Sequence, residues 1–337
     1  MLQVRALVSS THHVCVRYRL EAFRAAWQEQ GCKLVFEELP TNRFSRFRSL
    51  YSQRHEEITL LQRKTISCYE TDLLADRAHR FIYDFDDAVW LRDSYSNKGL
   101  YSSKQMARFR RIVRAADTVV AGNQFLLEQA LDMGAKRARL IPTCVDPYLY
   151  PLAEHSEWNR DLVWIGSSST LKGIQMFGRI LDQIHLALPK TRLRSICDHH
   201  PRLERMPVVE IPWKEETEAH EIAKGAIGIS WLPEDDWSRG KCGLKILQYM
   251  AAGLPVVTND IGVHREMVHD GLNGFLVKTP AEWIEAIRFL QRHPQIRQQM
   301  GMEGRRIVEE KYSIEVGAAA WLQLMQPSQP ALVAAAA

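Results

Sequence analysis

The chain has 337 residues, which is long for one domain and comfortable for two of roughly 150 residues each. Its apolar fraction of 46% and charged fraction of 25% are those of an ordinary globular protein. No apolar run approaches the ~20 residues that a membrane-spanning helix needs. The net charge of +4 hides an asymmetry, because residues 1–150 carry 23 Lys and Arg against 17 Asp and Glu, whereas the remainder carries 21 against 23. A basic first half and a nearly neutral second half suggest two domains with different partners.

The cysteines and the N-terminus favour a reducing compartment. The six cysteines are scattered without a CxxC pair, which argues against a zinc knuckle and against a disulfide framework. The first residues show no basic-then-apolar signal pattern. We therefore expect a cytoplasmic protein.

Short apolar runs alternate with helical patterns over the first 150 residues. We predict strands at 4–10, 32–40, 65–70, 80–85, 117–123 and 138–145, and helices at 18–31, 102–116 and 124–135. Strands that alternate with helices pair in parallel, which predicts an α/β layered domain.

Two stretches of the first half are strongly basic. Residues 104–114 carry five cations, and residues 42–54 combine arginines with aromatic residues spaced three to four apart: Arg43, Phe44, Arg46, Phe47, Arg48, Tyr51 and Arg54. Such a segment can lie on an anionic membrane surface, although a charged helix face is more often simply solvated.

Residues 146–161 are polar and contain two prolines, without helical or strand periodicity, so we interpret them as a linker. A second alternating series follows, with strands at 162–169, 191–198, 208–213, 227–233, 255–260 and 275–278 and helices at 172–189, 218–226, 242–253 and from 281 onward. This pattern predicts domains at 1–150 and 151–315, a helix at about 316–330 that packs back on the first domain, and a disordered tail at 328–337.

The most specific motif is residues 239–277, RGKCGLKILQYMAAGLPVVTNDIGVHREMVHDGLNGFLV. It resembles the donor-binding core of the retaining, family-4 (glycosyltransferase group 1) GT-B glycosyltransferases, in which a glycine-rich turn leads into a helix, followed by MAxGxPVV, a loop and G.NGFLV. The resemblance covers about residues 160–312 and is weaker over 1–150. It implies two Rossmann-like doubly wound parallel-sheet domains that face each other across a cleft, the first for the acceptor and the second for a nucleotide-sugar donor.

The glycine-rich turn suits a diphosphate. Gly240 and Gly243 allow the backbone to approach a ligand closely, and the helix that follows presents free N–H groups and the positive end of its dipole. A plain loop-to-helix turn with packing glycines is the alternative.

The resemblance also implies an arginine and a lysine at the diphosphate, both in the strand-loop WIGSSSTLKG. Lys172 stands at the lysine position, whereas Ser167 stands where the arginine is expected. Arg239, Lys241 and Lys245 cluster in the neighbouring turn, and the last two share one face if both are helical. We expect Lys245 or Lys241 to neutralise the leaving diphosphate in place of the arginine.

Two glutamates of the family pattern are missing. The resemblance places the first at the donor sugar and the second at the ribose, where this chain has Gly240 and Gln248. Gln248 can still bond to a ribose through its amide, together with Leu244. Gly240 has no side chain for the sugar, so one of the acids at 234–236 reaches in or the sugar is held differently. The resemblance places the base beside Ile211 and Trp213, although Trp213 could equally be a core residue.

Four polar residues crowd the first strand-to-helix loop, where relatives carry paired glycines: His12, His13, Arg17 and Arg19. We expect them to bind an anionic or hydroxyl-rich acceptor. A basic loop that is merely exposed is the alternative. Adjacent histidines seldom share one metal ion and no third ligand is evident, so no metal is expected.

The segment DFDDAVW, residues 84–90, ends a predicted buried strand at the cleft. Alternation places Asp84 and Asp86 on one face of that strand. In relatives this strand end often carries a His-Asp pair, and Asp86 and Asp87 occupy those positions. We interpret Asp86 as the residue that orients or deprotonates the acceptor or holds a donor-sugar hydroxyl. Asp87 is interpreted as its structural partner, which caps the loop or pairs with Arg92.

The resemblance thus implies a hexosyltransferase-type enzyme of class EC 2.4, which transfers a sugar from a UDP-sugar or GDP-sugar to an acceptor hydroxyl with retention and without a cofactor or metal. The acceptor would be a glycan, lipid or small molecule of cell-surface glycan or glycolipid synthesis. The anionic inner face of a membrane is a candidate partner, whereas nucleic acid is not. Two alternatives stay open, a sugar-nucleotide epimerase or hydrolase and a nucleotide-sugar-binding protein that has lost catalysis.

Overall fold

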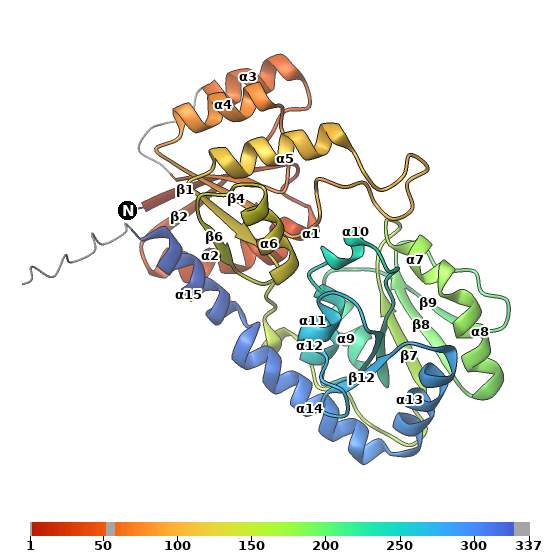
Figure 1. Cartoon of the computed structure of the whole chain (residues 1–337). Helices are drawn as coiled ribbons and strands as arrows, with labels where there is room; N and C mark the ends of the chain where they lie inside the picture. The colour runs from red at the N-terminus through yellow and green to blue at the C-terminus, as the bar shows by residue number, and fades with distance from the viewer. Residues whose placement is uncertain (1, 52–57, 327–337) are drawn as a thin grey trace, which may run out of the picture.

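The computed structural model describes residues 2–51 and 58–326; the predicted tail at 328–337 and Arg54 of the basic stretch lie outside these ranges. The chain forms two α/β domains, each built on a parallel sheet of six strands, as Figure 1 shows. The predicted α/β class, with two doubly wound parallel-sheet domains, is confirmed.

The first sheet has the order β2-β1-β3-β4-β5-β6, and its strands are β1 (Leu2–Val8), β2 (Cys32–Glu38), β3 (Ile58–Gln62), β4 (Arg80–Phe85), β5 (Thr118–Ala121) and β6 (Ala138–Leu140). The second has the order β12-β11-β10-β7-β8-β9, with β7 (Asp161–Ile165), β8 (Arg192–Cys197), β9 (Val208–Pro212), β10 (Ile227–Ser230), β11 (Val256–Asn259) and β12 (Gly274–Val277). In each sheet the chain first adds strands on one side of its first strand and then crosses to the other side. This reversal lies between β1 and β3 in the first sheet and between β7 and β10 in the second. Ligands of such sheets bind at the carboxyl ends of the strands at these points.

The helices and 3₁₀ turns of the first domain are α1 (Val14–Arg19), η1 (Glu21–Phe23), α2 (Arg24–Glu29), α3 (Arg43–Tyr51), α4 (Cys68–Arg77), α5 (Ser103–Ala115), α6 (Gln124–Asp132) and η2 (Pro147–Leu149). Those of the second are α7 (Leu171–Met176), α8 (Gly178–Ala187), α9 (Glu218–Ala223), α10 (Asp236–Arg239), α11 (Leu244–Ala251), α12 (His264–Met267), α13 (Pro280–Arg292) and α14 (Pro294–Lys311), followed by α15 (Ile314–Met325).

The strand predicted at residues 65–70 is wrong. Ser67 is instead the N-cap of α4, and it forms a capping box with Glu70, which starts a helix at this point. The strand lies earlier, as β3, whose five residues are all buried between β1 and β4.

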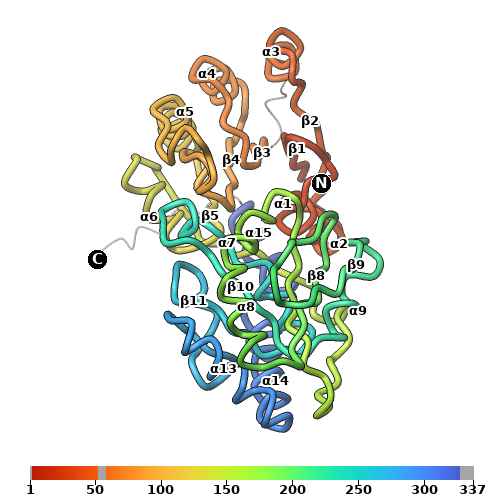
Figure 2. Tube along the Cα trace, turned by 90° about the vertical axis from the view of Figure 1, so that its right-hand side faces the viewer, coloured from red at the N-terminus to blue at the C-terminus, as the bar shows by residue number. Residues whose placement is uncertain are grey.

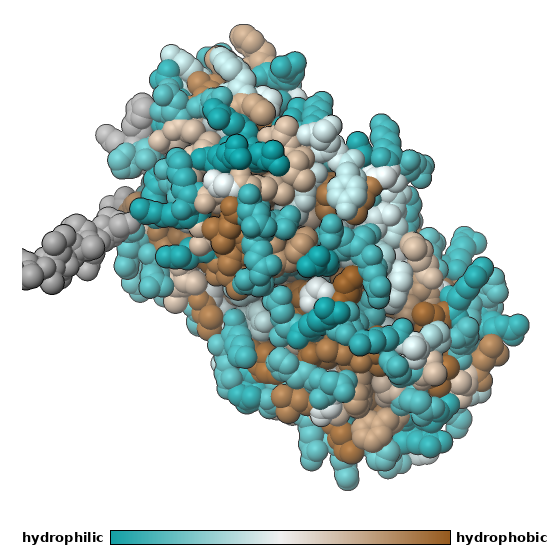
Figure 3. Space-filling model, in the orientation of Figure 1, coloured by the Kyte–Doolittle hydropathy of each residue, from teal (hydrophilic) through white to brown (hydrophobic). Residues whose placement is uncertain are grey.

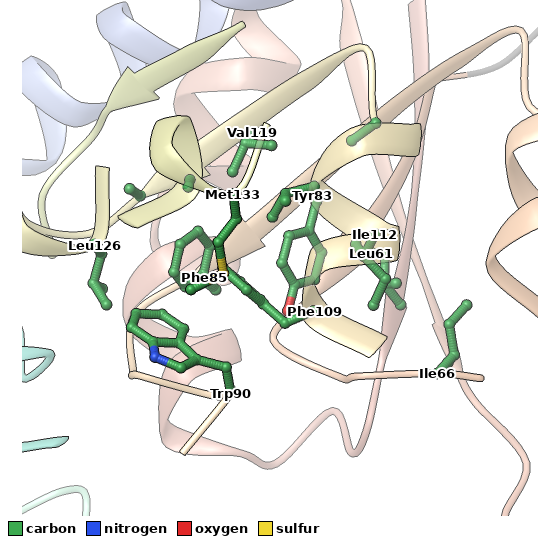
Figure 4. Close-up of a cluster of buried hydrophobic side chains, with 14 of the residues drawn as sticks. Leu61, Ile66, Tyr83, Phe85, Trp90, Phe109, Ile112, Val119, Leu126 and Met133 are labelled. Carbon is green, nitrogen blue, oxygen red and sulfur yellow. The ribbon is translucent and has the colours of Figure 1, made fainter. Parts of the chain in front are cut away.

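The strand that leads to the Asp-rich segment is anchored in an aromatic core. Tyr83 and Phe85 of β4 stack on each other, and Phe109 of α5 meets Phe85 edge-on with ring centroids 5.1 Å apart. Figure 4 shows these side chains together with Trp90, which follows the segment. The residues between Phe85 and Trp90 therefore start and end in the packed core, which fixes their position at the sheet edge.

The C-terminal helices join the two domains. Figures 1 and 2 show α14 along the second domain and α15 against the first. Trp321 of α15 meets Trp27 of α2 edge-on at 5.7 Å, and the chain crosses between domains where the Val145 N–H donates to the Tyr312 carbonyl at 3.0 Å. No helix within the described ranges is long and apolar enough to cross a membrane.

Candidate functional site

The turn before α11 lies at the reversal point of the second sheet, and we call residues 239–246 the donor turn. Gly243 has φ +67°, a left-handed conformation that favours glycine. Within the described part of the chain, none of the five backbone N–H groups of residues 242–246 has a hydrogen-bond partner. Consecutive free N–H groups at a helix N-terminus form an anion-binding site.

The three cations of this region have different partners. The Lys241 ammonium is paired with Asp87 across the domain boundary, at 2.7 Å, and lies over the Trp237 ring. Arg239 is paired with Asp236. Lys245, by contrast, forms no ion pair with any carboxylate in the described ranges, and its ammonium lies 5.5 Å from the Trp164 ring. Burial and then the neighbouring Lys241 lower the pKa of Lys245 to about 8.

The loop after β7 is held by a carboxylate. The Ser168 N–H donates to Asp198 at 2.7 Å, and the hydroxyls of Ser167 and Ser169 bond to each other. Burial alone would raise the pKa of Asp198, but hydrogen bonds from Ser168, Cys197 and His199 hold this pKa below its usual value. Lys172 is exposed at the start of α7, with no ion pair to a described carboxylate. The site thus has Lys172 and Lys245 as its unpaired cations.

Gly240 cannot be replaced by a residue with a side chain without movement. A Cβ at this position would lie 2.7 Å from both the Cβ and the backbone nitrogen of Ala88 in the first domain. Of the acids before the turn, Asp235 accepts the Ser238 N–H and caps α10, and Asp236 pairs with Arg239. Asp235 is therefore engaged in the cap, and Asp236 shares its carboxylate with Arg239.

The residues predicted at the ribose and base connect to the first domain. The Gln248 amide is buried and donates to the hydroxyls of Tyr18 and Tyr150, at 3.2 and 3.3 Å. The Tyr18 hydroxyl donates to Glu218, which also accepts the Trp213 indole N–H at 2.7 Å.

Two further residues predicted there, Ile211 on β9 and Leu244 at the start of α11, are half-buried, and Trp213 is 41% exposed. Because Tyr18 reaches Gln248 from the first domain, this part of the site is enclosed by both domains.

The four residues predicted to bind the acceptor have different surroundings in the structure. His12 is exposed, and His13 caps α1 by accepting the Cys15 N–H. Arg17 forms ion pairs with Glu215 and Glu218 of the second domain.

The prediction that Arg19 binds the acceptor is wrong. Its side chain is 1% exposed, and its guanidinium is paired with Asp84 and donates to the Ile141 carbonyl at 3.0 Å. Because Arg19 points from α1 into the interior of the first domain, its guanidinium binds the sheet and does not face a ligand.

The two aspartates after β4 lie at the carboxyl end of that strand, where Lys241 brings the donor turn against them. Asp87 is buried and accepts from Lys241 on one oxygen and from Arg63 on the other. Burial would raise the pKa of Asp87, but Lys241 and Arg63 hold it below its usual value. The predicted pairing with Arg92 is wrong, because the Arg92 guanidinium donates to backbone carbonyls of its own loop, including that of Lys98 at 2.9 Å.

Asp86 differs from its neighbour. Its side chain is 13% exposed, and its Oδ1 has no hydrogen-bond partner among the described residues, with the Arg63 Nε 3.6 Å away. The buried thiols of Cys15 and Cys242 flank it, and burial raises the pKa of both. These thiols therefore stay protonated and do not act as nucleophiles.

Arg63 is the residue that sequence reasoning missed. It follows β3 with φ +59°, the left-handed region, and its guanidinium contacts Asp87 and lies 3.3 Å from the His13 Nε2. Non-glycine residues in this conformation are strained and concentrate at functional sites. The sequence feature that could have identified Arg63 is its position directly after a strand. Because the strand was predicted at 65–70 instead, this position was not recognised.

Metal ligands are not grouped here. Among the residues that the structure describes, no three His, Cys, Asp or Glu side chains are arranged to hold a metal ion.

Residues 159–293 match the family model of the glycosyl transferases group 1. A segment of 66 residues is 38% identical to the putative glycosyltransferase EpsD of Bacillus subtilis, and it covers 19% of this chain but only 17% of EpsD. Two solved structures match nearly the whole chain. Sucrose-phosphate synthase from Thermosynechococcus elongatus has a TM-score of 0.73 at 14% identity, with 96% of this chain and 98% of that one covered. HepE from Anabaena, solved in complex with UDP, has a TM-score of 0.66 at 14% identity, with 96% and 99% covered.

The likeness to these structures concerns the fold, and it extends over both domains. The match to the family model concerns the domain that contains the donor turn, α11 and the loop after β7. The chain therefore has the GT-B fold, and its residues 159–293 are similar to the group 1 glycosyl transferases.

Proposed function

We propose that this chain transfers a sugar from a nucleotide-diphosphate sugar to an acceptor hydroxyl, with retention of the anomeric configuration and without a metal. The observation that carries the proposal is the donor turn, with its free N–H groups at 242–246 and the unpaired ammonium of Lys245. A diphosphate has enough oxygens to accept from several of these groups at once. A structure of HepE with UDP-glucose favours uridine as the base. Retention is what the resemblance to retaining enzymes implies.

The residues around the donor turn have different roles in this reaction. The N–H groups of the donor turn, Lys245 and Lys172 stabilise the negative charge that grows on the leaving diphosphate. Asp86, whose side chain is 13% exposed and is not hydrogen-bonded to a described residue through Oδ1, accepts a hydrogen bond from the acceptor hydroxyl or from a donor-sugar hydroxyl. Asp87 is saturated by Arg63 and Lys241, so it positions the segment and does not take a proton.

The test begins with the donor. Thermal shifts are measured with UDP-, GDP- and ADP-sugars, and a true donor at 100 times its Kd stabilises the fold by about 2.7 kcal/mol. Release of the nucleotide is then followed with and without candidate acceptors. Release that depends on the acceptor supports transfer, and release without an acceptor identifies a hydrolase instead.

The role of Asp86 is tested with Asp86→Asn. We expect kcat to fall at least ~100-fold, the size of a lost acid–base or orienting group, while nucleotide affinity stays within about twofold. Asp132→Asn, an exposed aspartate at the end of α6, is the matched control and keeps full activity. EDTA leaves the wild-type rate unchanged. A rate that requires a divalent cation would overturn the metal-free mechanism.

A further inference from the structure

The donor turn is attached to the first domain by one side chain. Asn123, which follows β5, is 2% exposed and donates through Nδ2 to the carbonyls of Arg239 and Lys241, at 3.0 and 2.8 Å. Its Oδ1 accepts the Leu126 N–H at 2.8 Å and caps α6. The oxygen faces an N–H and the nitrogen faces two carbonyls, so only one orientation of this amide satisfies all three bonds.

Neighbouring residues support the same contact. Gly122 leaves room for the Cys242 sulfur, which would lie 2.5 Å from a Cβ at that position. The Arg239 guanidinium lies over the Phe125 ring at 4.4 Å. The contact is therefore a built interface between α6 and the donor turn.

The geometry of the peptide bond links this interface to the anion site. In a trans peptide the C=O and the following N–H point in opposite directions. Because Asn123 holds the Lys241 carbonyl toward the first domain, the Cys242 N–H is held away from it, at the start of the free N–H series 242–246. Removal of the two bonds frees this peptide to rotate.

We propose that Asn123 is a positioning residue, which holds the donor turn from the first domain and thereby orients it for the diphosphate. The proposal rests on the proposed function, because it concerns the same ligand. It differs in that Asn123 acts through the carbonyls of Arg239 and Lys241.

The chain allows the two roles of Asn123 to be separated. Serine and aspartate are both good N-caps, so Asn123→Ser and Asn123→Asp keep the cap of α6. Serine cannot reach the two carbonyls, and aspartate places a carboxylate oxygen against them. Ser67→Ala removes a cap in the same domain whose hydrogen bonds, within the described ranges, go only to Glu70 and Thr71, and it is the matched control for lost stability.

Affinity is measured by calorimetry for UDP and UMP, or for the diphosphate and monophosphate of whichever base stabilises the wild type. Two lost hydrogen bonds to a buried site predict that both Asn123 variants bind the diphosphate at least about tenfold more weakly. We expect less than about a threefold loss for the monophosphate and no change for Ser67→Ala. Diphosphate affinity within about twofold of wild type in both Asn123 variants would overturn the proposal.

Hydrogen exchange of the ligand-free protein distinguishes this outcome from failure of the proposed function. Asn123→Ser should speed exchange of the hydrogen-bonded amides of Gly240 and Lys241 relative to wild type and to Ser67→Ala. If the wild type binds no nucleotide, the proposed function fails, and this measurement still decides whether Asn123 holds the turn. Unchanged exchange there would refute the positioning role.

Discussion

Lys241 and Lys245 are one helical turn apart in the sequence, yet the fold gives them different partners. Lys241 points across the domain boundary to Asp87, whereas Lys245 remains on the second domain beside Trp164 without a counter-ion among the described carboxylates. A buried ammonium without a partner is costly, because burial disfavours the charged form. A bound anion relieves that cost, so Lys245 is the better candidate for the charge that Ser167 does not supply.

The pKa of Lys245 makes this testable. Its lowered pKa of about 8 means that the ammonium is present below pH 8 and is lost as the pH rises through that value. The phosphates of the ligand are already fully ionised there, since their last pKa is near 6. Diphosphate affinity of the wild type should therefore fall between pH 7 and pH 9.5.

Lys245→Met should bind about tenfold or more weakly at pH 7, the size of a hydrogen bond to a charged group, and should lose this pH dependence. Calorimetry at both pH values measures it. Lys311→Met, an exposed lysine of α14, is the control. Equal affinities of Lys245→Met and the wild type at pH 7 would contradict the assignment.

At the scale of the element, β4 carries one aspartate inside the strand and delivers two beyond its end. Asp84 is fully buried and is paired with Arg19 of α1, so it joins the first helix to the sheet. Asp86 and Asp87 follow Phe85, where the aromatic core ends and the contact with the donor turn begins. The same strand thus supplies both an internal ion pair and the acidic wall of the site.

The ion pair predicts an asymmetric mutational effect. Arg19→Met should lower the free energy of unfolding by about 3–5 kcal/mol, because Asp84 is left charged and unpaired in the interior. Arg19→Met combined with Asp84→Leu should recover much of that loss, since well-packed apolar residues often replace a buried pair at little cost. Urea unfolding of both variants and the wild type measures the effect. An unchanged midpoint in Arg19→Met would show that Asp84 is not held by this pair.

At the scale of the molecule, the helices α3, α4 and α5 form a face away from the second domain, largely hydrophilic with scattered apolar groups in Figure 3. Arg46 and Arg111 of this face are already paired with Glu70 and Asp72. Three aromatic residues of this face are exposed, Phe44 by 77%, Tyr51 by 52% and Tyr69 by 67%. Exposed rings beside free arginines are the composition of a surface that contacts anionic lipid, which we propose for this face.

Vesicle co-sedimentation tests that contact. We expect binding to vesicles that contain anionic lipid and little binding to neutral ones, because each cation near such a surface contributes ~1 kcal/mol. Phe44→Ser with Arg48→Ser should weaken binding at least about tenfold. Trp158→Ser, an equally exposed ring of the second domain, should have no effect. Equal binding to neutral vesicles, or no loss in the double variant, would contradict a membrane face.

Local patterns were sufficient for most elements of this fold. The alternation of strands and helices follows from side-chain periodicity, and the turn at Gly243 from a residue that tolerates positive φ. The wrong strand at 65–70 is also local in origin, because a capping box at Ser67 and Glu70 outweighed the apolar run. Both the donor turn and the Asp-rich segment could be found because each is contiguous in the chain.

What the sequence determined by itself was therefore the layered α/β class and the two segments that carry polar groups to the strand ends. The tertiary structure alone decided which of those groups are free. Arg19 and Asp87 carry charges that are neutralised by Asp84 and Lys241, residues 65 and 154 positions away. Ion pairs and hydrogen bonds across that separation depend on the packing of whole sheets and domains, and no short-range pattern records them.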